Sequence, residues 1–309
     1  MVSIKGALTG RLDSVGLPAQ SRLMSVSDPI WPRPEAARSP DVMGRLLADG
    51  RTVVMGVLNI TPDSFSDGGL FLDPETAIAH GRRLVAEGAD LLDVGAESTR
   101  PYGGAVRISH EEEWERLRPV LPAVVDLGVP VSIDTMKAAV AARALAIGAA
   151  VVNDVWGLQR DPDMARVIGE HGAAVIIMHN REAEDGTIDI MADIEAYFAR
   201  SLEIAARAGI AREQIVLDPG IGFGKTQAQS ITVIARLARL QGFGLPVLIG
   251  LSRKRFIASV VPSEPHQRLG GSIAANLLAT LAGATFVRVH DVAETVQALR
   301  VMTAIRTAR

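Results

Sequence analysis

Cysteine is absent from all 309 residues of the chain. Disulfide bonds, thiolate metal sites and cysteine nucleophiles are therefore excluded. Neither sign of charge is in large excess, since 32 Lys and Arg residues stand against 35 Asp and Glu residues. The composition thus gives no electrostatic reason to expect nucleic acid or an anionic membrane surface as a partner, and a small molecule is expected instead.

Long apolar runs are missing too. The most apolar stretch, residues 273–289, is interrupted by Asn276, Thr280, Thr285 and Arg288, whereas a membrane-spanning helix needs roughly 18 uninterrupted apolar residues. The first fifty residues carry several prolines and serines without the continuous apolar core of a secretory signal. We therefore expect no membrane segment and a cytoplasmic location.

Several common active-site motifs are absent. The six histidines form no HExxH pattern and no close pair with zinc-ligand spacing, and no Gly-x-Ser-x-Gly elbow occurs. The stretch from Asp218 to Thr226 resembles a nucleotide-binding loop, but Pro219 occupies the place of the first glycine in GxxxxGK[ST] and the GxGxxG pattern also fails. The sequence therefore gives little support for a zinc hydrolase, a serine hydrolase or a nucleotide-binding loop. Binding of Mg²⁺ through Asn59 and a substrate phosphate stays possible.

What the chain does have is a series of eight short apolar runs separated by segments with helical spacing, such as Val140, Ala144 and Ile147. The runs cover residues 53–60, 91–96, 129–135, 151–155, 174–179, 215–219, 246–252 and 286–291. A glycine precedes several of them, as expected where a helix ends and the chain turns back. This alternation predicts a (β/α)8 TIM barrel, with a doubly wound open sheet as the alternative.

We expect a single domain with an N-terminal extension. A barrel of this type typically needs about 250 residues, which residues 51–309 supply. Residues 1–50 are expected to form the extension and a lead-in, with about residues 1–33 loosely ordered and residues 36–50 packed on the barrel. Helix starts are indicated by Asp73-Pro74, by Asp161-Pro162 and by a capping box of Ser109 with Glu112.

Nearly every apolar run ends in a residue that can hydrogen-bond, carry charge or bind a metal. These ends are Asn59, Asp93 with Glu97, Asp134, Asn153 with Asp154, His179, Asp218, Ser252, and Arg288 with His290. In a parallel barrel all eight strand ends meet at one mouth, so the chemistry is expected there. Strand alternation places Arg288 and His290 on one face, where both could bind one anion.

Each of these residues also has a structural reading that involves no ligand. Asp134 and Asn153 could make hydrogen bonds inside the barrel, because buried charge without a partner is costly. The first loop, residues 59–69, could be an ordinary capped turn, and Arg100 could be a solvated surface charge.

Phe223, in the glycine-rich loop after Asp218, could stack on a flat ligand.

Taken together and in order, the motifs resemble those of the dihydropteroate synthase family. The resemblance is carried by residues 59–69, 97–101, 132–135, 153–154, 178–179, 218–225, 252–254 and 288–290. It implies a TIM barrel that joins 6-hydroxymethyl-7,8-dihydropterin diphosphate to 4-aminobenzoate in folate biosynthesis, with Mg²⁺ and usually as a homodimer.

The resemblance also implies a role for each matching residue. The pterin would be bound by Asp134, Asn153, Asp218, Lys254 and Met178. The diphosphate would be bound by Asn59, Thr99, Arg288 and His290, with Asn59 also at the metal. The 4-aminobenzoate would be bordered by Thr99, Pro101, Phe223 and Ser252. The catalytic residues would be Arg288, His290, Lys254, Thr99 and Arg100.

The chain departs from the family pattern in two places. The second loop reads Gly95-Ala96-Glu97 where two glycines are common, with Tyr102-Gly103-Gly104 after Pro101, and the chain lacks a Gly-x-Pro stretch after His179. Two alternatives remain, a pterin-binding methyltransferase domain that serves a corrinoid partner and a non-catalytic pterin-binding paralogue. The residues expected at the diphosphate favour the synthase over the methyltransferase domain, which needs none of them, and a non-catalytic paralogue is disfavoured because every expected site position is filled.

Overall fold

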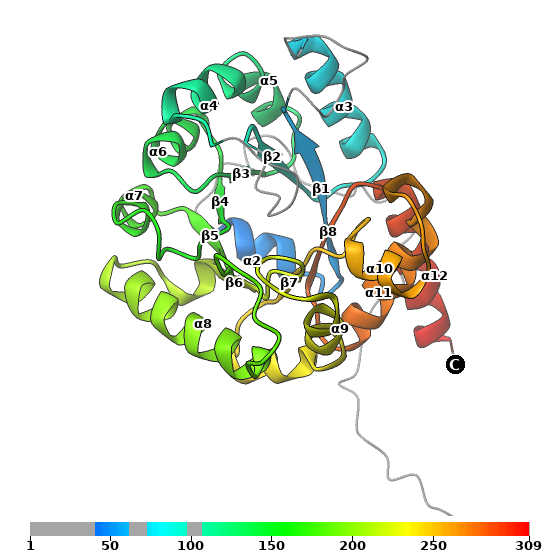
Figure 1. The fold of residues 1–309 in the computed structure, drawn as a ribbon. Coiled ribbons are helices and arrows are strands. Elements are labelled where there is room, and N and C mark those ends of the chain that lie inside the picture. The colour runs from blue at the N-terminus through cyan, green and yellow to red at the C-terminus, as the bar shows by residue number, and fades with distance from the viewer. Residues whose placement is uncertain (1–40, 62–72, 98–106, 309) are drawn as a thin grey trace, which may run out of the picture.

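The computed structural model describes residues 41–61, 73–97 and 107–308, and its strands form one parallel sheet rolled into a barrel (Figure 1). The strands are β1 (Val53–Asn59), β2 (Leu91–Gly95), β3 (Val131–Asp134), β4 (Val151–Asp154), β5 (Ala174–Met178), β6 (Ile215–Asp218), β7 (Leu248–Ile249) and β8 (Phe286–Val289). Their order in the sheet is β6-β5-β4-β3-β2-β1-β8-β7. A parallel bridge between Leu217 and Val247 joins the two outer strands, so the predicted (β/α)8 barrel is confirmed.

Helices surround the ring of strands, and a helix follows nearly every strand (Figure 1). The α-helices are α2 (Val42–Leu47), α3 (Pro74–Ala86), α4 (His110–Leu117), α5 (Leu121–Val125), α6 (Ala138–Ile147), α7 (Met164–His171), α8 (Ile190–Arg207), α9 (Gln227–Ala235), α10 (Arg255–Val260), α11 (Leu269–Leu281) and α12 (Val292–Thr307). Short 3₁₀ turns are η2 (Arg212–Gln214), η3 (Leu237–Phe243) and η4 (Pro265–Gln267). No helix within the described ranges is long and apolar enough to cross a membrane.

Two of the three expected helix starts are confirmed, and the third helix starts two residues later than expected. The Asp73 side chain accepts the first N–H groups of α3, and Ser109 with Glu112 forms the capping box of α4. Helix α7 begins at Met164, and Asp161 Oδ1 accepts the backbone N–H of Asp163 at 3.0 Å in the turn that leads into it. Asp161 Oδ2 also accepts the backbone N–H of Ala138 at 2.8 Å, at the start of α6, a helix that precedes it in the chain. Sequence-local cap rules could not identify this partner.

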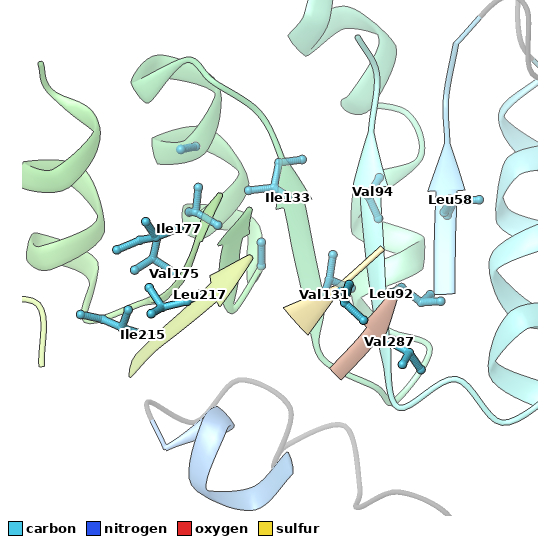
Figure 2. Packing of buried hydrophobic residues seen from close by; sticks show 14 of the residues in the cluster. Leu58, Leu92, Val94, Val131, Ile133, Val175, Ile177, Ile215, Leu217 and Val287 are labelled. Atoms are coloured by element: carbon cyan, nitrogen blue, oxygen red, sulfur yellow. The ribbon is translucent and has the colours of Figure 1, made fainter. Parts of the chain in front are cut away.

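The strands are apolar on both faces, as the sequence indicated. Their outward-facing residues, among them Leu58, Val94, Ile133, Ile177 and Leu217, form one buried cluster with the helices (Figure 2). Burial on both faces suits the parallel strands of a closed barrel.

Helix α2 packs against the second apolar cluster, which lies inside the barrel. Val42, Met43 and Leu46 are almost fully buried, together with strand residues such as Met55 and Phe286. These strand residues lie toward the strands' N-terminal ends, opposite the polar mouth. The described part of the expected lead-in therefore seals the floor of the barrel. The expected loose order of the extension falls on residues 1–40, outside the described residues, and the boundary at residue 51 stays a prediction.

We predict that Leu46→Ala destabilises the barrel by about 2 to 4 kcal/mol, because it removes buried methyl groups and leaves a cavity in the floor. Urea unfolding followed by circular dichroism measures this change. Leu47→Ala is the matched control, since Leu47 is only partly buried and its loss should cost clearly less. Equal losses for the two variants would show that α2 is not a packed floor.

Candidate functional site

Polar side chains from different strands meet at the C-terminal mouth of the barrel. Strand register places Asp134 beside Asn153 and Asp93 beside Ser132. They come from three neighbouring strands, β2, β3 and β4, and all four are buried. The predicted convergence of distant strand ends is therefore confirmed for these residues.

Arg288 is the central contact of this cluster. Its Nε donates to Asp93 Oδ2 at 2.6 Å and its Nη2 donates to Asp134 Oδ2 at 2.9 Å. Asn153 Nδ2 also donates to Asp93 Oδ2, at 3.0 Å. Burial opposes the charge on Arg288, but the two carboxylates outweigh this effect and raise its pKa. The guanidinium therefore stays charged and holds the two carboxylates in place.

Several acceptor atoms in the cluster have no hydrogen-bond partner. Within the described part of the chain, these buried atoms are Asp93 Oδ1, Asp134 Oδ1, Asn153 Oδ1 and Ser132 Oγ. Buried polar atoms are rarely left unsatisfied, and each exception needs an explanation. A flat ligand with several N–H donors would satisfy them together.

The Asp134 carboxyl holds its proton unusually well. Burial raises its pKa to about 8, and the charge of Asp93 adds to the shift, while the charge of Arg288 opposes it. A carboxyl that titrates near neutrality can accept or donate a hydrogen bond, depending on its protonation state. The cluster can therefore match a ligand that presents both donors and acceptors.

Asp218 ends β6 on the other side of the mouth. Its Oδ1 accepts the backbone N–H of Gly220 at 2.7 Å, and burial raises the pKa of the carboxyl. Lys254 Nζ donates to the Ile221 carbonyl at 2.8 Å and lies 4.4 Å from the centre of the Phe223 ring. The loops after β6 and β7 thus bring a carboxylate, an ammonium and an aromatic face together.

Ser252 and His290 form a separate pair. Ser252 Oγ accepts the backbone N–H of His290 at 3.3 Å and lies 3.1 Å from His290 Nδ1. Strand β8 ends at Val289, one residue before His290, so the expected alignment of Arg288 with His290 on one face stays a prediction. The two residues have different partners, although both belong to the mouth.

The remaining expected site residues are distributed as follows. Asn59 is half-buried at the end of β1, and Met178 is buried at the end of β5, in register with Asp218. Thr99, Arg100 and Pro101 lie outside the described residues, so their expected roles stay predictions. Sequence reasoning assigned no role to Asp93 beyond marking a strand end. The signal that could have identified it is a single charged residue inside the apolar run Leu91–Gly95.

Comparison with known proteins gives the class of protein first. A family model described as pterin binding enzyme matches residues 55–290, which include all the described mouth residues. The barrel and its polar mouth are thus those of a pterin-binding enzyme.

Individual relatives define the family more narrowly. The chain is 43% identical over 256 residues to the dihydropteroate synthase of Bacillus subtilis (strain 168), covering 82% of this chain and 89% of that protein. A crystal structure of Xanthomonas albilineans dihydropteroate synthase with 4-aminobenzoic acid matches with a TM-score of 0.80 and 44% identity, covering 84% of this chain and 94% of that one. The same enzyme with 7,8-dihydropteroate matches with a TM-score of 0.79 and 42% identity, covering 87% of this chain and 99% of that one. The chain belongs to the dihydropteroate synthase family.

The raised pKa of Asp134 predicts a dependence of stability on pH. The unfolded carboxyl releases its proton near 3.8 and the native one near 8, so the native state binds more protons between these values. The stabilisation is complete below the unfolded pKa and is lost as the pH rises through the native pKa. Asp134→Asn should therefore gain at least about 1 kcal/mol of unfolding free energy relative to wild type between about pH 5 and about pH 9.

Urea unfolding at both pH values measures this gain. Asp126→Asn, at an exposed position, is the control and should show no such change. A parallel pH dependence of wild type and Asp134→Asn would contradict the assignment.

Proposed function

We propose that this chain joins 6-hydroxymethyl-7,8-dihydropterin diphosphate to 4-aminobenzoate. A C–N bond forms between the pterin methylene and the aniline nitrogen, the C–O bond to diphosphate breaks, and the nitrogen loses a proton. The observation that carries this proposal is the group of buried, unpartnered acceptors beside Arg288, in a chain whose relatives include synthases solved with 4-aminobenzoic acid and with 7,8-dihydropteroate.

The acceptors suit the edge of a pterin. This heterocycle presents an exocyclic amine beside a ring N–H, a pair of donors that one carboxylate can accept together. Asp218 is proposed for this contact, because only its Oδ1 is engaged by Gly220. Asp134 and Asn153 would bind further polar atoms of the ring, Lys254 would bind from the loop after β7, and Met178 would cover a ring face.

The diphosphate and the second substrate would occupy the outer part of the mouth. Arg288 Nη1 makes no hydrogen bond to a described residue while Nε and Nη2 are held, so it can contact the departing diphosphate. His290 would add a second donor, and Phe223 with Ser252 would border the 4-aminobenzoate. Thr99 is proposed for both ligands, with Pro101 beside the aminobenzoate and Arg100 beside the reacting groups.

The residues present fit a Mg²⁺ ion that is carried largely by the substrate. The described residues contain no cluster of three His, Asp or Glu side chains that could form a protein cage. Magnesium is commonly held by one or two protein oxygens together with substrate phosphates, and the half-buried Asn59 amide supplies one such oxygen. The ion would neutralise charge on the diphosphate.

Positioning and charge stabilisation account for most of the expected rate. The electron pair of the broken C–O bond leaves with the diphosphate, and the electron-rich ring can delocalise the positive charge left on the methylene. No strong general base is required for an aniline nucleophile. The chain's own task is to align the two substrates and to place cationic donors, Arg288 and His290, where negative charge develops.

The test is diphosphate release that depends on both 4-aminobenzoate and the pterin diphosphate. A pterin-binding methyltransferase domain or a non-catalytic paralogue would bind the pterin without this dual dependence. Asp218→Asn should lower pterin affinity about 10- to 100-fold, since it removes a charged acceptor of two hydrogen bonds. Calorimetry with a diphosphate-free pterin measures the affinity, Asp126→Asn is the control, and unchanged binding would contradict the role of Asp218.

We also propose that the protein forms a homodimer through α11 and α12, which lie side by side (Figure 1). Leu278 and Leu281 on α11 are 62% and 55% exposed, and Val301 and Ile305 on α12 are 53% and 70% exposed. A second copy of the chain would cover these side chains, because such patches mark interaction surfaces. A cytoplasmic location stays our expectation.

Introducing charge into this surface should separate the protomers. The double variant Leu281→Arg/Ile305→Arg is expected to sediment as a monomer where the wild type sediments as a dimer. Ile231→Arg, on α9 and 41% exposed, is the matched control and should remain dimeric. A wild type that is monomeric at micromolar concentration would contradict the proposal.

A further inference from the structure

Lys225 is a fully buried lysine that the expected site does not include. It lies between the loop after β6 and the start of α9, and its side chain has 0% exposure. Its Nζ lies 2.7 Å from His179 Nδ1 and donates to the carbonyls of Gly220 at 2.8 Å and Phe223 at 3.1 Å. These three short contacts match the three donors of an ammonium group, and the His179 carbonyl lies further away, at 3.5 Å. Such complete pairing is what makes a buried charge tolerable.

The histidine continues this network away from the mouth. His179 Nε2 lies 3.0 Å from Asp193 Oδ2, which also accepts from Arg181 at 2.9 Å. If Lys225 donates to Nδ1, then Nε2 carries the histidine proton and donates to Asp193. Burial and the charge of Lys225 lower the pKa of His179, so the ring stays neutral. The network is a fixed anchor behind the loop.

The loop itself needs an anchor, because three of its residues have an unusual backbone conformation. Gly220, Gly222 and Gly224 have φ values of 64°, 81° and 55°, a region that only glycine adopts readily. Lys225 engages the carbonyls of Gly220 and Phe223, and Lys254 engages the carbonyl of Ile221 between them. The two ammonium groups therefore hold three carbonyls of one turn.

We infer that Lys225 is a positioning residue: its buried ammonium fixes the turn from Gly220 to Phe223, and through that turn it sets Phe223 and Lys254 against Asp218. This inference rests on the proposed function. Only four of the chain's 32 basic residues are lysine, and arginine could not replace this one. A guanidinium is larger and planar, whereas these three partners surround one nitrogen.

The charge on Lys225 should depend on pH in the working range. Burial lowers its pKa to about 7, with Lys254 and Arg181 lowering it further, while Asp218 and Asp193 raise it and His179 is neutral. The ammonium is present below this pKa and is lost as the pH rises through it. The turn should therefore loosen on the alkaline side.

The absence of cysteine allows a sharp test. In Lys225→Cys the introduced thiol is the only one in the chain. After unfolding, alkylation with 2-bromoethylamine places an ammonium at nearly the length of lysine, and alkylation with iodoacetamide places a neutral amide there. Both products are refolded, together with wild type and with Ala196→Cys, an exposed control, taken through the same steps. Circular dichroism checks folding before the kinetics are measured.

The aminoethylated protein should regain kcat/KM for 4-aminobenzoate to within about threefold of wild type, whereas the carbamidomethylated protein should remain about 10- to 100-fold lower. Pterin affinity should change less in both, because Asp218 stands on a strand. Since sulfur withdraws electrons and lowers the amine's pKa, the alkaline limb of the aminoethylated protein's pH profile should move to lower pH. A purely structural lysine would not produce this shift.

Three results would overturn the inference. Equal activity of the two alkylated proteins would show that the charge is not needed. Failure of both to refold, while wild type refolds, would assign Lys225 to folding alone. If aminoethylation did not move the alkaline limb of the pH–activity profile, the charge of residue 225 would not control the activity. A wild type without substrate-dependent diphosphate release would instead refute the proposed function itself, and with it this inference.

Discussion

The architecture of the mouth depends on the compensation of charge that is buried inside a barrel. Arg288 reaches Asp93 and Asp134 from the strand that closes the ring beside β1, so one cation lies against two buried acidic groups. Removing Arg288 would leave these groups without their cationic partner, and breaking a buried pair in this way costs several kcal/mol in typical proteins. The pairing uses only one oxygen of each carboxylate, and the other oxygen remains for a ligand. Structural compensation and ligand recognition thus share the same groups.

The apolar floor makes this arrangement effective. Helix α2 fills the opposite end of the barrel with Val42, Met43 and Leu46, so the interior beneath the polar cluster is apolar and buried. Burial in such an interior removes the water that would stabilise a carboxylate. This desolvation is the main reason why the pKa values of Asp134 and Asp218 are raised above that of an exposed carboxyl. A ligand that supplies N–H donors would replace the hydrogen bonds that these carboxyl groups lost when burial separated them from water.

The sequence predicted the barrel and its convergent strand ends, because both follow from periodicities within short segments. Asp134 and Asn153 could be identified as polar residues near the ends of apolar runs, and parallel register then placed them side by side. Contacts set by side-chain conformation across the barrel could not be predicted. Arg288 and Asp93 are 195 residues apart, and the periodicity of β8 suggested His290 as the companion of Arg288, although each has other partners. Likewise, no local pattern revealed that Lys225 is buried.

The conformation of the loops at the mouth is fixed by residues that neighbour the proposed ligand contacts. Arg253, between Ser252 and Lys254, has a φ of 60°, which is strained for a residue with a side chain. Its N–H donates to Ser272 Oγ at 2.9 Å, its carbonyl accepts from Arg268 at 2.9 Å, and its guanidinium pairs with Asp291.

A strained residue persists only when its surroundings over-determine it, and here the backbone on both sides of Arg253 and its side chain are all held. From this turn the neighbouring Ser252 contacts His290, and Lys254 contacts the loop after β6. The turn after β6 is also held in an unusual backbone conformation. There, glycines adopt the positive φ values without strain, and hydrogen bonds from Lys225 fix the turn. In both loops, precise placement of the ligand-facing residues comes from buried hydrogen bonds made by their neighbours.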